Sequence, residues 1–290
     1  MNRIAIALLA LFAGITLIGC SNATISGLGG ESSRLASSSA KGSAIALASS
    51  SSIAVASSGS CSNFVSANSF TDCRDGQTYK TVVIGAQTWM AQNLNYSGDN
   101  GSGVRTYTKG WCYGVGGTDT TQHQDSSSCT KGYGRFYNWT DAMNISPIYQ
   151  TKAATGVVIS ATVNNRGICP SGWHMPSQAD WDSLAAFIRI DKSVTDGNEG
   201  MYIKAVINPD PTDWDSTYNA QDPYGFSALP AGFRNGNRDC SNLVYDACFW
   251  TTTENDASIA NIRRLYNNSA LLDWNIYSKT LGFSARCLRN

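Results

Sequence analysis

Nine cysteines restrict the folds open to this 290-residue chain. Cys20 ends an apolar N-terminal segment, and the other eight lie between residues 61 and 287. An even number of cysteines in an exported chain indicates a disulfide framework, although sequence alone does not fix its connectivity. Proximity favours three local pairs and leaves one long-range pair: Cys61–Cys73, Cys112–Cys129, Cys240–Cys248 and Cys169–Cys287. A metal-binding role is disfavoured because there is no CxxC motif and neither histidine has ligand spacing from two cysteines.

The N-terminus predicts export and lipid anchoring. Arg3 precedes the apolar run "IAIALLALFAGITLI", which is too short for a comfortable membrane span. The run ends in "LIGC", Leu17–Cys20, the pattern of a bacterial lipoprotein signal of residues 1–19 with an acylated Cys20. The alternative is an ordinary secretory signal with a coincidental cysteine. We expect a protein of the bacterial cell envelope, anchored in the outer membrane bilayer and facing the periplasm or the cell surface.

Composition divides the remaining chain into a tether and one domain. Residues 20–60 are rich in Ser, Ala and Gly and contain no aromatic residue, so they cannot bury enough apolar area to fold. They predict a disordered tether. Residues 61–290 have a length that fits one large domain. The formal net charge of zero, without a basic stripe, excludes a nucleic-acid partner.

Local patterns predict several elements of this domain. Asp75–Gly76 is a turn signal, and "TYKTVVI" and "QTWMAQNL" on either side of "GA" predict a β-hairpin. Helical spacing of apolar residues predicts a short helix from about Tyr137. "ACFWTTTE" predicts a strand, residues 258–280 predict two paired strands, and "FSALPAGFRNGN" predicts strand, turn and strand. A final strand is expected to place Phe283, Ala285 and Cys287 on one face.

The stretch "CPSGWHMPSQADW", Cys169–Trp181, predicts the start of a second helix. Ser177 is a good N-cap, and Asp180 three residues later completes a shortened capping box. Trp181, Leu184, Ala185 and Ile188 then share one face. We interpret His174 as a structural residue bonded to backbone rather than a catalytic one, and His123 as a solvated loop residue.

An acidic and aromatic loop at residues 208–224 supplies the candidate ligand face. Aromatic rings stack on sugars, while amides, carboxylates and guanidinium groups bond to hydroxyls. The candidate ligand-binding residues are Trp214, Asp215, Tyr218, Tyr224, Arg234 and Asn237. Clustered carboxylates could also bind Ca²⁺ through Asp210, Asp213, Asp215 and Asp222, although the spacing does not match an EF-hand. The alternative is a solvated loop without a ligand.

Six segments resemble the Fibrobacter succinogenes major paralogous domain (FISUMP) in content and order, over roughly residues 70 to 290. They are "RDGQTYKTVVIGAQTWMAQNLNY", "YGRFYNWTDAM", "CPSGWHMPSQADW", "YGFSALPAGFR", "FWTTTE" and "GFSARCLRN". A more distant likeness connects "HMPSQADW", "GFR" and the terminal "GFSARC" to the formylglycine-generating fold, a variant of the C-type lectin architecture.

This likeness implies an α+β, C-type-lectin-like domain. It would have two short helices, a curled antiparallel sheet, long disulfide-stapled loops and a terminal strand beside the first. In that architecture a long disulfide joins the helical region to the last strand, where Cys169 and Cys287 stand. The motifs for calcium-dependent sugar binding are not matched, since "QDP" (Gln221–Pro223) has another order and "DWN" (Asp273–Asn275) lacks the following acid.

Three functions remain open from sequence. The first is a surface-tethered, non-catalytic binding module for polysaccharide or another cell-surface ligand. The second is a structural envelope lipoprotein without a small ligand. The third is an enzyme of unknown reaction on a lectin-like fold, for which the sequence offers no catalytic constellation.

Overall fold

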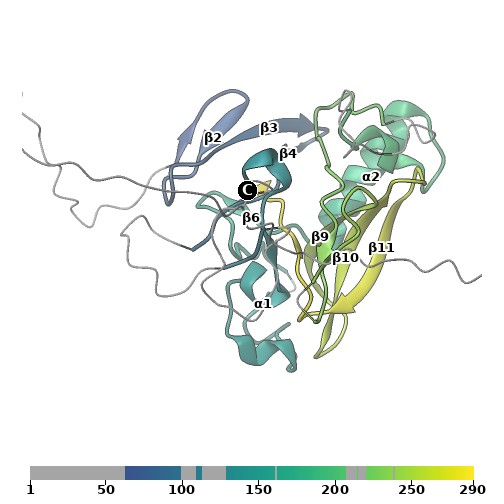
Figure 1. The fold of residues 1–290 in the computed structure, drawn as a ribbon. Coiled ribbons are helices and arrows are strands. Elements are labelled where there is room, and N and C mark those ends of the chain that lie inside the picture. Colours follow the sequence, from purple (N-terminus) through teal and green to yellow (C-terminus); the bar gives the residue numbers. More distant parts are fainter. Residues whose placement is uncertain are drawn as a thin grey trace, which may run out of the picture.

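The computed structural model describes residues 63–98, 109–112, 129–160, 162–206, 214, 220–237 and 239–290. The predicted signal peptide, the tether, Cys20, Cys61 and His123 lie outside these residues. Within them, short helices and mostly antiparallel strands form an α+β fold, in agreement with the coarse expectation (Figure 1).

The predicted hairpin is confirmed. β3 (Thr78–Ile84) and β4 (Gln87–Met90) pair antiparallel around a turn at Gly85. Gly85 has a φ of +60°, a conformation that glycine adopts without the steric cost of a Cβ. The β-branched residues of "TYKTVVI" suit the extended backbone of β3. The turn signal Asp75–Gly76 lies between β2 (Ser69–Thr71) and β3, where the Gly76 N–H donates to the Asp72 carbonyl.

These strands belong to a six-stranded sheet of order β1-β2-β3-β4-β13-β6. Its further members are β1 (Phe64–Val65), β6 (Trp173–His174) and β13 (Leu288–Arg289). The last strand of the chain therefore lies between β4 and β6. The distant likeness implied a terminal strand beside the first strand, and this expectation is wrong. The six-stranded sheet brings the His174 segment next to the C-terminus.

A five-stranded sheet of order β11-β10-β9-β12-β5 forms the other large layer. Its members are β5 (Phe136–Tyr137), β9 (Asp246–Glu254), β10 (Ile259–Tyr266), β11 (Leu272–Ser278) and β12 (Phe283–Ser284). The antiparallel pairing of β10 with β11 confirms the predicted strand pair. β7 (Phe233–Arg234) and β8 (Cys240–Ser241) form a separate hairpin. The predicted strand, turn and strand of residues 226–237 is therefore wrong, since β7 is the one named strand in that range.

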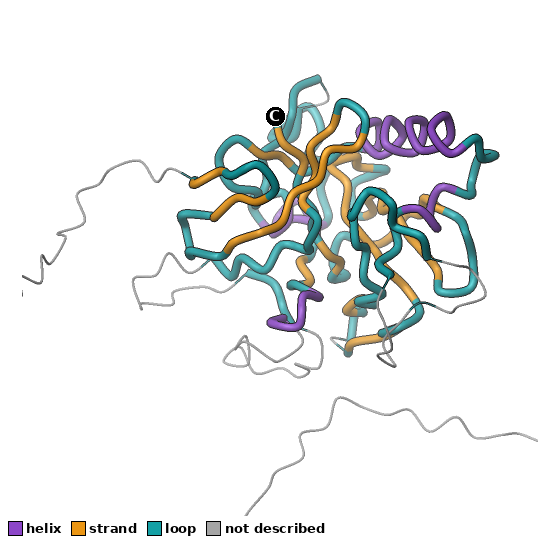
Figure 2. The backbone as a smooth tube through the Cα atoms, turned by 90° about the horizontal axis from the view of Figure 1, so that it is seen from above, coloured by secondary structure: helices purple, strands orange, loops and turns teal. Residues whose placement is uncertain are grey.

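The long helix α2 (Gln178–Lys192) begins as predicted. The Asp180 N–H donates to Ser177 Oγ over 3.2 Å, and the Ser177 N–H donates to Asp180 Oδ2 over 2.8 Å, so both halves of the capping box are present. The predicted apolar face is buried against β9 and β10. Figures 1 and 2 show α2 along one side of the molecule, beside the five-stranded sheet.

The first predicted helix begins later than expected. Phe136 and Tyr137 pair with β12, so these residues are strand. Asn138 then caps α1 (Trp139–Ala142), accepting the Asp141 N–H at 2.8 Å. Short 3-10 turns, η2 (Pro147–Gln150) and η3 (Glu199–Tyr202), and a kinked π-type turn, η1 (Cys129–Tyr133), complete the elements.

The C-terminal segment connects the two sheets instead of forming one continuous strand. β12 pairs in the five-stranded sheet and β13 in the six-stranded sheet, with residues 285–287 between them. Side chains on both faces of this segment are buried, including Phe283, Ser284 and Arg286. Arg286 is 1% exposed, and its guanidinium lies 4.4 Å from the centroid of the Phe226 ring.

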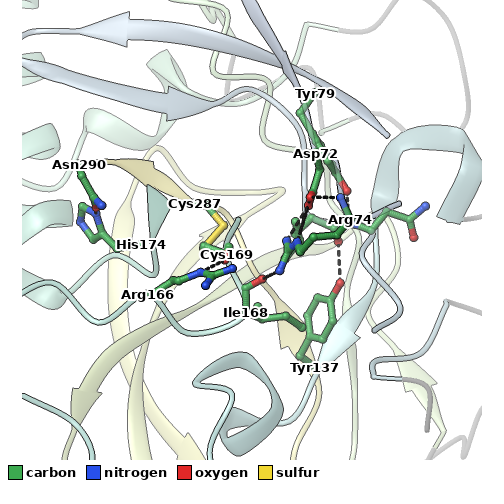
Figure 3. Close-up of a disulfide and its surroundings, with 12 residues drawn as sticks. Asp72, Arg74, Tyr79, Tyr137, Arg166, Ile168, Cys169, His174, Cys287 and Asn290 are labelled. Carbon is green, nitrogen blue, oxygen red and sulfur yellow. Dashed lines mark hydrogen bonds and ion pairs between the residues drawn. A yellow bond between two sulfur atoms is a disulfide. The ribbon is translucent and has the colours of Figure 1, made fainter. Parts of the chain in front are cut away.

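Two of the predicted disulfides lie wholly within the described residues. Cys112 is joined to Cys129. Cys169 is joined to Cys287 across 118 residues, and Figure 3 shows this second bridge. Beside the long bridge, Arg74 contacts Asp72 over 2.6 Å and donates to the Ile168 carbonyl over 2.8 Å, which fixes the β2–β3 turn against the bridge. Cys73 is also disulfide-bonded, while its predicted partner Cys61 lies outside the described residues.

The predicted Cys240–Cys248 bridge is wrong. Cys240 lies in β8, which pairs with β7, whereas Cys248 lies in β9 opposite Arg264 of β10. The two cysteines therefore belong to different sheets, despite being close in sequence. Cys248 is a buried thiol, and burial raises its pKa far above the ordinary value.

Candidate functional site

A groove of about 490 Å³ lies between α2 and the edge strand β11. One wall comes from α2 and carries Asp182 and Arg189; the other comes from β11 and carries Asp273 and Trp274. The segment around η3 closes one end with Gly197 and Glu199. We refer to this feature as the α2–β11 groove.

The sheet explains why an aromatic ring is exposed there. α2 packs on β9 and β10, whereas β11 is the outermost strand. Along β11, Leu272, Trp274 and Ile276 share one face because side chains alternate along a strand. Leu272 reaches the core, while Trp274 is 56% exposed and Ile276 is 42% exposed. The sheet therefore extends beyond the helix that covers it, and Trp274 lies in the uncovered strip.

Ion pairs line the groove. Arg263 lies opposite Trp274 in the β10–β11 register and contacts Asp182 of α2. Arg189 binds Asp196, and its Nη1 lies 2.6 Å from Oε1 of the buried Glu199. Asp182 and Asp196 remain largely exposed at their carboxylates, so they can accept hydrogen bonds from a ligand.

Close backbone packing holds the end of the groove in place. A Cβ on Gly200 of η3 would lie 2.4 Å from the Leu271 carbonyl oxygen and 2.7 Å from that of Ala270. Only glycine allows η3 to approach the β10–β11 connection this closely. This contact positions Glu199, and through it Arg189, at the groove.

An exposed indole beside exposed carboxylates suits a hydroxyl-bearing ligand. The indole offers a flat apolar face to the C–H face of a sugar ring, and its N–H can donate. Carboxylates accept from hydroxyls, and guanidinium groups donate to ring and hydroxyl oxygens. The α2–β11 groove therefore has the groups needed to bind a polar ring-shaped ligand.

Two of the described members of the predicted ligand face are buried. Trp214 is 6% exposed and its indole N–H donates to the Ala228 carbonyl over 2.8 Å, so the expectation of an exposed stacking ring there is wrong. Arg234 is also buried, with its guanidinium 4.1 Å from the centroid of Trp111. Asp215 and Tyr218 lie outside the described residues.

The other two predicted residues lie on separate elements. Tyr224 is half-buried and donates from its hydroxyl to Asp191 of α2 over 2.6 Å. Asn237 is exposed in the turn between β7 and β8. Trp214 and Tyr224 contact one core cluster, whereas Arg234 packs on Trp111 and Asn237 is exposed in the turn of the β7–β8 hairpin.

The calcium prediction depends mainly on residues without a description. Asp210, Asp213 and Asp215 lie outside the described residues. Asp222 accepts from the N–H and hydroxyl of Ser227 over 3.0 and 2.8 Å, and burial raises its pKa. Among the described residues, no group of three or more His, Cys, Asp or Glu side chains could hold a metal ion. Calcium binding stays a prediction.

His174 is held by a side chain rather than by backbone. Its Nδ1 lies 2.7 Å from Oδ1 of Asn290, the last residue of the chain (Figure 3). The partner of His174 is therefore the side-chain amide of Asn290 and not the backbone group expected from sequence. The six-stranded sheet causes this contact, because β13 pairs directly with β6.

The residues of the α2–β11 groove were not identified from sequence. Alternation in "LDWNIYS" places Trp274 and Ile276 on one face, which is a usable signal. However, the pattern does not show that β11 is an edge strand. It also does not show that α2 packs on β9 and β10 and leaves part of β11 uncovered. Local sequence predicts the strand pair but not its neighbours.

Comparisons with known proteins give a family but no function. No helix in the described part of the chain has the length and apolar character needed to span a membrane. No curated protein and no solved structure matches the chain significantly. A sequence model described as the Fibrobacter succinogenes major domain matches residues 82–289, which is most of the chain. The chain therefore belongs to the Fibrobacter succinogenes major domain family.

Proposed function

We propose that this protein is a lipid-anchored, non-catalytic binding module of the cell envelope that binds a polysaccharide or a similar hydroxyl-rich surface polymer. The observation that carries the proposal is the α2–β11 groove, whose lining combines the 56% exposed Trp274 with Asp182 and Arg189 of α2. Glycan contact of this kind requires no metal and no catalytic pair.

The N-terminal sequence supports the location in this proposal. "LIGC" would place an acyl anchor on Cys20, and a tether of residues 20–60 would separate the anchor from the domain. The outer membrane and its periplasmic or surface-exposed face are the expected sites. Many anchored copies on one cell would raise the apparent affinity for a repeating polymer without new contacts.

A C-type-lectin-like arrangement is part of the same proposal. The long Cys169–Cys287 bridge between the start of the α2 region and the end of the chain supports it. A purely structural envelope lipoprotein is the competing function, and it would leave the groove without a ligand.

A glycan array probed with the full-length chain tests the proposal. We expect binding to at least one polymeric glycan, with micromolar to millimolar affinity, and a loss of more than tenfold in Trp274→Ala. Tyr245→Ala is the matched control, because Tyr245 is 57% exposed and does not line the groove. Equal binding by Trp274→Ala and the unmodified chain would refute the groove as the glycan site.

A further inference from the structure

A second cavity, of about 280 Å³, lies at the beginning of α2. Its walls come from residues 155–160 and 162–165, from the segment between β6 and α2, and from the end of β9. This volume is near the lower end of the range for small-molecule sites, so the cavity suits a ligand no larger than a single ring with its substituents.

His174 lies at this cavity with one ring nitrogen unpartnered. The side chain is 4% exposed, and Nδ1 is occupied by Asn290. Nε2 is buried without a hydrogen-bond partner among the described residues and lies 3.8 Å from Asp180 Oδ2. A buried polar atom without a partner destabilises the folded state, so its retention beside a cavity points to a ligand at this site.

Asp180 is the accessible member of the pair. Its side chain is 27% exposed, whereas that of His174 is almost fully enclosed. The Ser177 N–H and hydroxyl both donate to Asp180 Oδ2, over 2.8 and 2.6 Å, which leaves Oδ1 for a ligand. A ligand in the cavity would therefore meet Asp180, with His174 behind it.

The remaining wall favours a neutral, hydroxylated ligand. Ser160, Thr162, Thr252 and Thr253 contribute hydroxyl-bearing residues, and hydroxyls both donate and accept. The other carboxylate, that of Glu254, is already neutralised by Lys279 and accepts the Ala154 N–H over 2.9 Å. A cationic ligand could pair only with the Asp180 carboxylate, because Glu254 is already paired with Lys279. The hydroxyls of a neutral ligand could each bond to a side chain of the wall.

We propose that this cavity binds a single sugar residue or a polyol of similar size, with a ligand hydroxyl donating to Asp180 and His174 acting as a positioning residue. The site stands on its own cavity and its own unpartnered nitrogen, and does not rest on glycan binding in the α2–β11 groove. Asn290 fixes the imidazole, and the imidazole in turn limits where the Asp180 carboxylate can lie.

Imidazole NMR of the full-length chain tests this site directly. The chain has only two histidines, so the His174 signals can be assigned with a His174→Gln variant. We would titrate D-glucose, D-galactose, D-xylose and N-acetyl-D-glucosamine, with ethanolamine as the cationic alternative. At least one sugar should shift the His174 signals saturably and leave those of His123 unchanged.

Two valines provide a blocking variant and its control. Val163 lines the cavity and is 66% exposed, whereas Val157 is 68% exposed in the same loop and does not line it. Val163→Trp should fill the opening and weaken sugar binding at least tenfold, and Val157→Trp should leave it unchanged. Sugar shifts that persist in Val163→Trp, a response to ethanolamine alone, or no response to any sugar would each overturn the proposal.

Asn290→Ala separates positioning from simple stability. We expect at least a threefold loss of sugar affinity in a variant that still melts cooperatively, although the loss of the partner of the buried Nδ1 should lower the melting temperature somewhat. A lower melting temperature with unchanged affinity would overturn the positioning role of His174. Trp274→Ala should leave the sugar-induced shifts intact, so failure of the groove proposal and failure of this one give different results.

Discussion

Trp214 and Trp274 both lie in segments that combine aromatic and acidic residues, yet the fold places them differently. Trp214 is 6% exposed and packs beneath Ala228, while Trp274 is 56% exposed on an edge strand. The loop around Trp214 has the composition expected of a ligand face, and the strand around Trp274 has that of a structural element. Exposure of an aromatic ring is therefore set by what packs against it, and local composition is a poor guide to it.

The neighbours of the two rings explain the difference. Lys204 lies with its Nζ 4.8 Å from the centroid of Trp214 and donates to the carbonyls of Tyr266 and Ser269, so the ring is enclosed by a buried cation and by backbone. Trp274 lies in β11, which pairs with β10 on one side and is the edge strand of the described sheet on the other. An edge strand keeps one side open, which natural proteins use or protect.

The largest expected effect is from Trp214→Ala. Removing a buried indole leaves a cavity and removes the hydrogen bond from the indole N–H to the Ala228 carbonyl, so we expect a loss of about 3–5 kcal/mol in the free energy of unfolding. Urea denaturation of the full-length chain measures this loss. A change below about 1 kcal/mol would mean that Trp214 is not a core residue.

Lys204→Ala should have the next largest effect. The Lys204 Nζ lies 2.6 Å from the Tyr266 carbonyl, and hydrogen bonds to charged groups contribute about 1.5–3 kcal/mol each. We expect a loss of about 2 kcal/mol, measured by the same denaturation. A Lys204→Ala, Trp214→Ala double variant should lose less than the sum, since the two side chains are in contact. If the two losses of stability simply added, Lys204 and Trp214 would stabilise the fold independently, contrary to this expectation.

Asp222 should make the stability of the fold depend on pH. Burial raises the pKa of its carboxyl, so the folded state binds this proton more tightly than the unfolded state does. The contribution is fully present below the ordinary carboxyl pKa and is lost as the pH rises through the folded value. The stability advantage of the unmodified chain over Asp222→Asn should therefore decrease from about pH 3 to pH 7. Denaturation at several pH values checks the slope, and an increase with pH would contradict the burial effect.

The smallest effect on stability is expected for Trp274→Ala. An exposed side chain that covers little core should change the free energy of unfolding by less than about 0.5 kcal/mol. Calorimetric melts of the variant and the Tyr245→Ala control should coincide with that of the unmodified chain. A loss comparable to that of Trp214→Ala would remove the contrast between the two regions.

Local signals predicted much of the fold because they act within a few residues. The capping box of Ser177 and Asp180, the β-branched run of β3 and the β10–β11 pair were all recognised from sequence, and each depends on contacts near in the chain. Trp139 illustrates the limit: its helical spacing was correct, but pairing of Phe136 and Tyr137 with β12 delayed the start of α1.

The candidate sites were harder to predict because they depend on partners far apart in sequence. Asp182 meets Arg263 and His174 meets Asn290, across 81 and 116 residues respectively. Cysteine proximity correctly suggested Cys112–Cys129 but wrongly suggested Cys240–Cys248, since strand pairing placed the latter two in different sheets. Short separation in sequence therefore does not ensure that two cysteines are joined, since Cys248 remains a buried thiol.

The sequence by itself determined the family, the two central helices in outline and the β3–β4 and β10–β11 pairs, because residue order, capping and alternation specify these features locally. Only the tertiary structure decided that Trp214 is core, that Trp274 is exposed and that His174 is anchored by the C-terminus. The physical reason is that burial is a property of the whole packing arrangement. A side chain becomes core or surface according to which strand ends a sheet and which helix covers it, and neither is encoded in its immediate neighbours.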